Sequence, residues 1–123
     1  MVNYVNSLRD LVSKVTNGIP VTTTYPDTDI VPIVILSELN QVEIFKCDVY
    51  EHAASTISIE IYTKDISTRT ELRDRIDKYM KDLRYNLVKK EDLDNTTIYV
   101  SKLTYECEVI DREGSVSIYS KKQ

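Results

Sequence analysis

The residues that could support catalysis are few, and their spacing does not match a known catalytic arrangement. His52 is the only histidine, with Asp48 four residues before it and Ser55 three residues after it. A Ser-His-Asp triad requires the imidazole to take a proton from the hydroxyl while the carboxylate orients the ring. Neighbours this close in sequence arise often by chance. We therefore interpret His52 as a loop histidine in solvent rather than as a catalytic base.

Metal, phosphate and nuclease chemistry are not supported by the residue types or their spacing. Glu60 and Lys64 are four residues apart on an expected strand, so they lie ~13 Å apart along it, too far to share the water of metal-dependent hydrolysis. Cys47 and Cys107 have no CxxC spacing, and with one histidine they are too few for structural zinc. Two glycines are too few for a glycine-rich phosphate loop. We predict no enzymatic activity, no metal and no cofactor.

The length and composition indicate a single domain over residues 1–123. The net charge of −4 gives no electrostatic footprint for nucleic acid. The longest apolar stretch, Ile30 to Leu36, is too short to span a bilayer, and the chain opens without an apolar signal segment. We therefore expect a cytosolic product with free thiols and no membrane contact.

Hydrophobic periodicity predicts two amphipathic helices. The first covers residues 4–15 and ends at Gly18, which suits a C-terminal stop. The second runs from Thr68 to Arg84, where Thr68 and Glu71 are expected to form a capping box. The ion pairs expected on its solvated face are Glu71–Arg75, Asp74–Lys78 and Asp77–Lys81. The expected core-facing residues are Tyr4, Leu8, Leu11, Val12 and Val15 in the first helix and Leu72, Ile76, Tyr79, Met80 and Leu83 in the second.

Apolar alternation predicts the main strands. Residues 30–39 are apolar on both faces at their centre, which is typical of a central strand covered by a helix. The strand 56–63 should bury Ile57, Ile59 and Ile61. In the strand 96–110 the alternation changes phase. Either a bulge near Ser101 and Lys102 restores one inward face, or the strand crosses between two packing environments.

The remaining segments complete the predicted fold. Residues 19–29 form an extended connector with a turn at Tyr25-Pro26-Asp27, and residues 89–94 form a loop with a little strand. A turn at residues 111–114 leads into a closing strand, 116–119, with Gly114 at its left-handed position. The prediction is an α+β fold, a mostly antiparallel β-sheet with two α-helices packed on one face.

The segment from Asn40 to Ala54 is the strongest candidate for contact with a partner. It is either a protruding hairpin or a long loop between two strands, and loops of this length without a function are uncommon in compact domains. Aromatic side chains are enriched in protein interfaces. The predicted interface residues are Phe45, Asp48, Tyr50 and His52 in this segment, and Glu60 as a surface or intersubunit charge.

Two parts of the chain resemble the core of phage tail terminator proteins. The first is the run Ser58 to Thr63 with the charged amphipathic helix Arg69 to Met80, and the second is the run Leu103 to Asp111 ahead of a short last strand. The size, the opening helix and the Ile19-Pro20-Val21 entry to the sheet match as well. The resemblance covers residues 4–119 and is to terminators of prophages and phage-tail-like particles of low-GC Gram-positive bacteria.

This resemblance implies a role in virion assembly. Six copies would form a ring that caps the head-proximal end of the tail tube and stops its polymerisation. Before the ring assembles, the free protein would be a monomer in solution. The ring would contact the tail tube protein, the neck or head–tail connector proteins and, in a contractile tail, the last sheath ring. DNA would pass only through its lumen. The protein would be assembled in the bacterial host cytoplasm and end in the tail or neck of the virion.

Three other interpretations of the sequence stay open. A neck or head-completion connector protein would share a small α+β fold and the virion setting. A small cytosolic enzyme or nuclease would need a catalytic constellation that the residue spacing does not suggest. A stand-alone peptide- or protein-binding module would use an exposed sheet edge.

Overall fold

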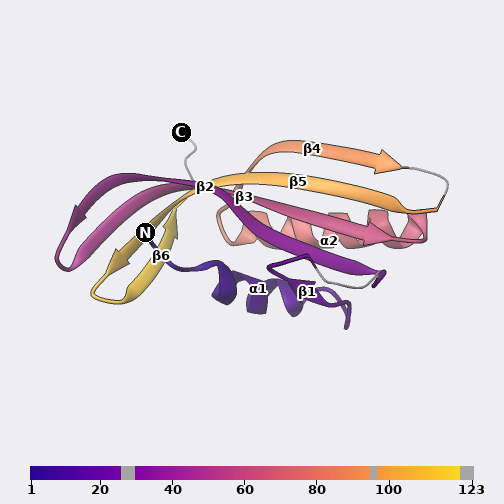
Figure 1. Cartoon of the computed structure of the whole chain (residues 1–123), viewed down its shortest axis with the longest axis horizontal. Coiled ribbons are helices and arrows are strands. Elements are labelled where there is room, and N and C mark those ends of the chain that lie inside the picture. The colour runs from indigo at the N-terminus through magenta and orange to yellow at the C-terminus, as the bar shows by residue number, and fades with distance from the viewer. Residues whose placement is uncertain (26–29, 95–96, 120–123) are drawn as a thin grey trace.

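The computed structural model describes residues 1–25, 30–94 and 97–119. Within them the chain forms a six-stranded sheet in the order β1-β2-β3-β5-β4, with β6 paired to β5 (Figure 1). Every strand pairing is antiparallel except that of β1 with β2. The elements are α1 (Val5–Ser13), β1 (Val21–Thr22), β2 (Ile33–Cys47), β3 (Tyr50–Thr63), α2 (Ile66–Asp82), β4 (Asn86–Asp94), β5 (Tyr99–Arg112) and β6 (Ser115–Tyr119).

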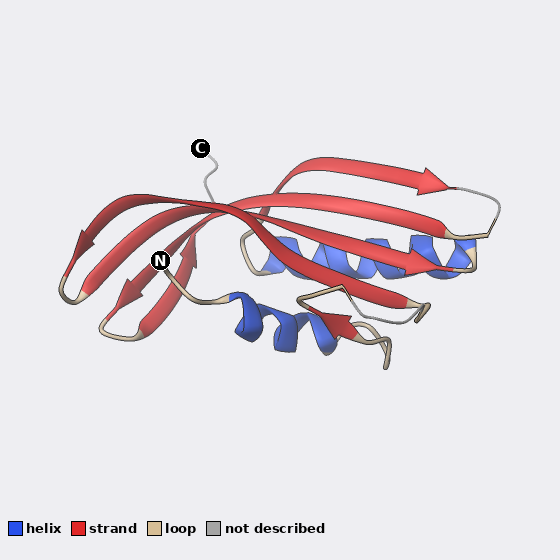
Figure 2. Cartoon of the chain, viewed as in Figure 1, coloured by secondary structure: helices blue, strands red, loops and turns tan. Residues whose placement is uncertain are grey.

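Both helices pack against one face of the sheet, called here the inner face (Figure 2). This confirms the predicted α+β class with a mostly antiparallel sheet. The three isoleucines of β3 are buried on the inner face as predicted, and burial of each such side chain contributes roughly 1.5–3 kcal/mol. The residues that meet them in the core include Leu8 and Val12 from α1, Leu72, Ile76 and Met80 from α2, and Leu103 and Tyr105 from β5.

The sheet continues beyond the helices as two adjacent hairpins, which we call the arm (residues 40–56 and 107–119; Figures 1 and 2). β5 joins the two parts, because it pairs with β4 from Tyr99 to Glu106 and with β6 from Glu108 to Arg112. The first hairpin, β2–β3, is the protruding hairpin that was one of the two alternatives for this segment. The backbone N–H of Glu113 donates to the carbonyl of Val49 over 2.8 Å and so ties the two hairpin tips together.

The start of α2 differs from the predicted capping box. The helix begins at Ile66, and its N-cap is Asp65, whose carboxylate accepts hydrogen bonds from the backbone N–H (2.9 Å) and hydroxyl (2.8 Å) of Thr68. Thr68 is therefore the third helical residue and not the cap, and Glu71 lies exposed in the next turn. The extended backbone of Asp65 suits a cap, and Asp ranks with Ser and above Thr at this position.

We expect Asp65→Ala to destabilise α2 and Glu71→Ala to have a smaller effect, limited to its exposed ion pair with Arg75. The two hydrogen bonds from Thr68 hold the pKa of the Asp65 carboxyl below its usual value. Its contribution to stability is therefore present above that usual value, near 3.9, and is lost as the pH falls through the lower folded pKa. Thermal unfolding followed by circular dichroism at neutral and acid pH tests this. A melting temperature lowered by Glu71→Ala but not by Asp65→Ala would contradict the assignment.

The side chains of the two helices mostly follow the predicted pattern. Two of the expected ion pairs in α2 form, with 3.8 Å between Glu71 and Arg75 and 3.0 Å between Asp77 and Lys81. In the third expected pair, Asp74 instead contacts its neighbour Arg73. The chain leaves α1 through a left-handed Gly18 (φ 87°), as predicted. The predicted core-facing residues that are only partly buried are Leu11, Val15, Tyr79 and Leu83.

The structure corrects the predicted end of β2 and the bulge suggested in β5. β2 begins after Pro32 and runs to Cys47, eight residues further than predicted, and its first four residues are buried on both faces as expected. β5 pairs with β3 in unbroken register, so the bulge suggested near Ser101 is wrong. Ser101 itself is a buried inward residue, and its polar side chain disguised a continuous alternation. The register shifts occur instead in β2, at 38/40 and 43/45, and in β4, at 87/89.

The predictions of loops were only partly correct. Residues 89–94 belong to β4, a nine-residue edge strand paired along β5. Charged side chains are tolerated there because an edge strand leaves them in solvent, and they also discourage unwanted pairing. The connector 19–29 contains β1, and its turn at Pro26-Asp27 lies outside the described residues, as does Thr96. Gly114 has the left-handed conformation predicted for the last turn (φ 89°). Among the described residues, no helix is long and apolar enough to cross a membrane.

Candidate interaction surface on the arm

Three of the predicted interface residues form an aromatic cluster on the arm. The rings of Phe45 and Tyr50 lie 5.4 Å apart at 61°, and those of Tyr50 and His52 lie 6.4 Å apart at 84°. Both are edge-to-face contacts, the arrangement that ring quadrupoles favour. The guanidinium of Arg112 lies 5.4 Å from the centroid of the Tyr50 ring, within range of a cation–π interaction.

A bulge in β2 explains why Phe45 joins this cluster. Glu43 pairs with Ala53, and after the register shift Phe45 pairs with His52, which leaves Ile44 as the extra residue. Ala53 is an inner-face residue, so His52 and Phe45 point to the opposite, outer face. Without the bulge, alternation would turn Phe45 to the inner face. The local irregularity therefore places an aromatic side chain where solvent and partners can reach it.

Exposed apolar side chains are concentrated on the arm and at Leu39, the residue just before it. Phe45 is 53% exposed, and four other large hydrophobic residues between positions 39 and 49 are 51–56% exposed. Such concentrations on a folded surface mark sites of interaction with other molecules. These four residues are Leu39, Val42, Ile44 and Val49. Together with Phe45 and Tyr50 we call them the arm surface.

His52 is held by an acidic partner and not by the residues of a triad. Its Nε2 lies 2.7 Å from Oε1 of Glu108 on the neighbouring strand. Ser55 lies on the inner face, where its hydroxyl donates to Glu38 over 2.7 Å. Asp48 lies exposed at the β2–β3 turn. The interpretation of His52 as a solvent loop residue was wrong, because hairpin pairing places it half-buried in β3.

The structure brings together four of the five predicted interface residues. Phe45, Tyr50 and His52 are in contact, and Asp48 lies at the adjacent turn. Glu60 also faces outward on β3, but it lies eight residues from His52, roughly 27 Å along the strand. Its carboxylate accepts hydrogen bonds from the hydroxyls of Tyr25 (2.5 Å) and Tyr62 (3.0 Å). Burial, and then this carboxylate, raise the pKa of Tyr62.

Carboxylates gather at the tips of the arm. A small hollow of about 130 Å³ between the two tips is lined by nine residues, of which Asp48, Glu51, Asp111 and Glu113 are acidic and Lys46 is basic. Asp111 is engaged locally, because it accepts a hydrogen bond from the backbone of Gly114 over 2.8 Å. Across the described ranges, no group of three or more His, Cys, Asp or Glu side chains is placed to hold a metal ion. Glu51 is paired with the Met1 ammonium over 2.6 Å and Arg112 also lies here, so the tips carry charges of both signs with carboxylates in excess.

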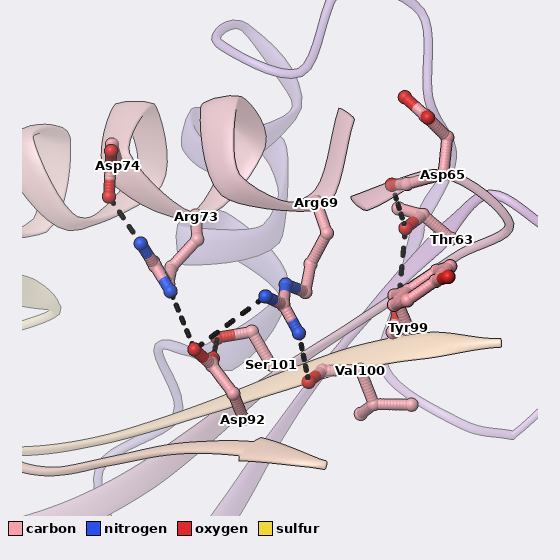
Figure 3. Close-up of polar contacts among 9 residues, drawn as sticks. All are labelled: Thr63, Asp65, Arg69, Arg73, Asp74, Asp92, Tyr99, Val100 and Ser101. Carbon is pink, nitrogen blue, oxygen red and sulfur yellow. Dashed lines mark hydrogen bonds and ion pairs between the residues drawn. The ribbon is translucent and has the colours of Figure 1, made fainter. Parts of the chain in front are cut away.

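A second polar cluster, not predicted from the sequence, links α2 to the sheet (Figure 3). Asp92 of β4 accepts hydrogen bonds from Arg73 (2.8 Å) and Ser101 (2.9 Å), and Arg69 lies 3.7 Å away. Partial burial raises the pKa of Asp92, but Ser101 and the two guanidinium groups outweigh it, so the pKa lies below its usual value. The Asp92 carboxylate therefore has a structural role, since it holds α2 against the sheet. The spacing of Arg69 three residues before Leu72 on the buried helix face was the signal that could have revealed the cluster.

Comparison with protein-family models and with curated proteins gave no match to this chain. The function is therefore inferred from the fold and the arm surface.

Proposed function

We propose that this protein is a structural assembly protein of the phage tail terminator type. In this proposal a ring of six copies caps the head-proximal end of the tail tube, ends tube polymerisation and offers a surface to the neck proteins. Its role is binding and not catalysis. The observation that carries the proposal is the arm, which projects beyond the helices and presents exposed apolar side chains next to an acidic tip.

The two ends of the molecule are suited to a closed ring. A ring of identical subunits needs two different and complementary patches on each copy. The arm surface is apolar and aromatic, whereas β4, at the edge of the sheet, combines the charged Lys89, Lys90 and Glu91 with the exposed apolar Val88 and Leu93. Exposed apolar anchors with a polar rim are typical of protein interfaces. The arm surface and β4 are thus two different patches on one copy, which is what head-to-tail contacts in a ring require.

The proposal predicts a specific defect when the protein is absent. Negative-stain electron microscopy should compare tails from host cells with an intact gene, with a deletion, and with the deletion complemented. We expect overlong or ragged tubes in the deletion and normal length on complementation. Tails of normal length that fail to join heads would overturn the terminator role in favour of a neck protein. Normal particles would exclude both roles.

A further inference from the structure

The chain before α1 runs along the inner face of the arm, where two of its side chains are almost completely buried. Val2 is 1% exposed and Tyr4 is 4% exposed. Residues 2–4, which we call the strap, have no regular secondary structure. Figure 1 shows this part of the chain passing beside β6 before it enters α1. The strap therefore covers part of the arm that neither helix reaches.

Side chains, and not a backbone ladder, attach the strap to the arm. The amide of Gln41 on β2 binds both backbone groups of Val2, accepting from its N–H over 2.7 Å and donating to its carbonyl over 3.0 Å. The hydroxyl of Tyr4 is hydrogen bonded to Ser55 of β3. Glu38 anchors both partners, because it accepts from Gln41 and from Ser55, each over 2.7 Å.

One further tie holds this end of the chain to the arm, the ion pair between the Met1 ammonium and Glu51 over 2.6 Å, while the space beside the strap is open. Hollows of about 310 Å³ and 230 Å³ flank it, and Asn3, Tyr4 and Ser7 line both. The N-cap of α1 is Tyr4, which makes no capping hydrogen bond, and the first turn carries no acidic residue. An uncapped first turn frays more readily than a capped one.

We propose that the strap is a releasable latch, docked through Gln41 and Ser55, whose detachment uncovers the inner face of the arm. Docked, it holds the arm in a fixed position relative to α1. Released, it exposes apolar side chains of β3 and β5 that the closed form buries. The inference does not depend on the assembly role proposed above.

The protein contains its own reporter for this opening. Cys107 of β5 pairs directly with Ser55, the hydroxyl that Tyr4 contacts, and its thiol is buried. Burial raises the pKa of this thiol to about 12, so the closed form presents almost no reactive thiolate at about pH 8. Cys47 is exposed, and Cys47→Ser leaves Cys107 as the single thiol.

The experiment measures the rate at which Cys107 reacts with dithiobis-nitrobenzoate in native buffer, in the full chain carrying Cys47→Ser. Gln41→Ala removes both backbone hydrogen bonds of the latch. We expect it to raise the labelling rate about tenfold, with little dependence on low concentrations of urea because the opening exposes little surface. Ser101→Ala is the matched control, since it removes one hydrogen bond of the inner face far from the strap. Its labelling rate without urea should stay unchanged.

A second reporter is needed because Tyr85 also lies near Cys107 and can shield its thiol from the reagent after the strap has detached. Ala53→Cys, in a chain with Cys47→Ser and Cys107→Ala, places a thiol at the next inward position of β3 towards the arm tip. We expect the same acceleration by Gln41→Ala. The latch would be overturned if the labelling rates of both thiols followed only the global free energy of unfolding in every variant. Those rates would then also show the full urea dependence of global unfolding.

Discussion

Replacing Ile76 by alanine should lower the free energy of unfolding by about 2–5 kcal/mol. Ile76 is fully buried at the centre of α2, in the core that joins the helix to β3 and β5. Truncation removes apolar contacts and leaves a cavity that the rigid sheet cannot collapse to fill. Urea denaturation followed by circular dichroism gives the change directly.

The matched control is Ile66→Ala in the same helix. Ile66 is exposed at the first helical position, so the same truncation should change stability by no more than about 0.5 kcal/mol. Equal effects at the two positions would show that the buried face of α2 is wrongly assigned. Both changes replace isoleucine by alanine in the same helix, so the comparison tests burial and not side-chain size.

Replacing Phe45 by glutamate should prevent assembly while the monomer stays folded. The change puts a charge at the centre of the arm surface, where an interface anchor contributes at least about 1.4 kcal/mol, or tenfold in affinity. We expect at least about a tenfold loss of correctly terminated tails in the complementation experiment. The unfolding free energy should change by no more than about 1.5 kcal/mol, the value of the aromatic contact with Tyr50.

Ile66→Glu provides the control for the Phe45 substitution. Ile66 is an exposed apolar residue at the start of α2, outside both the arm surface and β4. If any added negative charge disturbed assembly, both variants would fail equally. If Phe45→Glu assembles normally, the arm surface is not the contact region, whatever the role of the protein.

The fold was predictable from the sequence where side chains report burial directly. The alternating isoleucines of β3 and the apolar stripe of α2 each face a single environment, so their periodicity gave the correct element and face. β4 was predicted only as a loop with a little strand, because an edge strand draws its stability from backbone pairing with β5, which leaves charged side chains such as Lys89 and Lys90 in solvent. Ser101 hid the inward phase of β5 because its buried hydroxyl is compensated by Asp92 from another strand.

The candidate surface was predictable only in part, because part of it depends on strand pairing that the local sequence does not show. The unusual length of segment 40–54 indicated a projection, and the hairpin brings Phe45, Tyr50 and His52 together. The bulge that turns Phe45 outward depends on the pairing of β2 with β3, which no local pattern reveals. Glu60 was grouped with them although it lies far along the same strand, because separation in space cannot be judged before strand lengths are known.

The unbroken pairing of β3 with β5 has a mechanical consequence. These strands run through both the arm and the part of the sheet covered by the helices, and their register contains no shift. A pull on the arm along the strands would load their hydrogen bonds in shear, so that many would have to break together. The flanking strands β2 and β4 contain the irregular positions and would yield first. We therefore expect the central pair, β3 and β5, to resist a pull more than β2 and β4. A force on the arm would be carried along this pair to the part of the sheet that the helices cover.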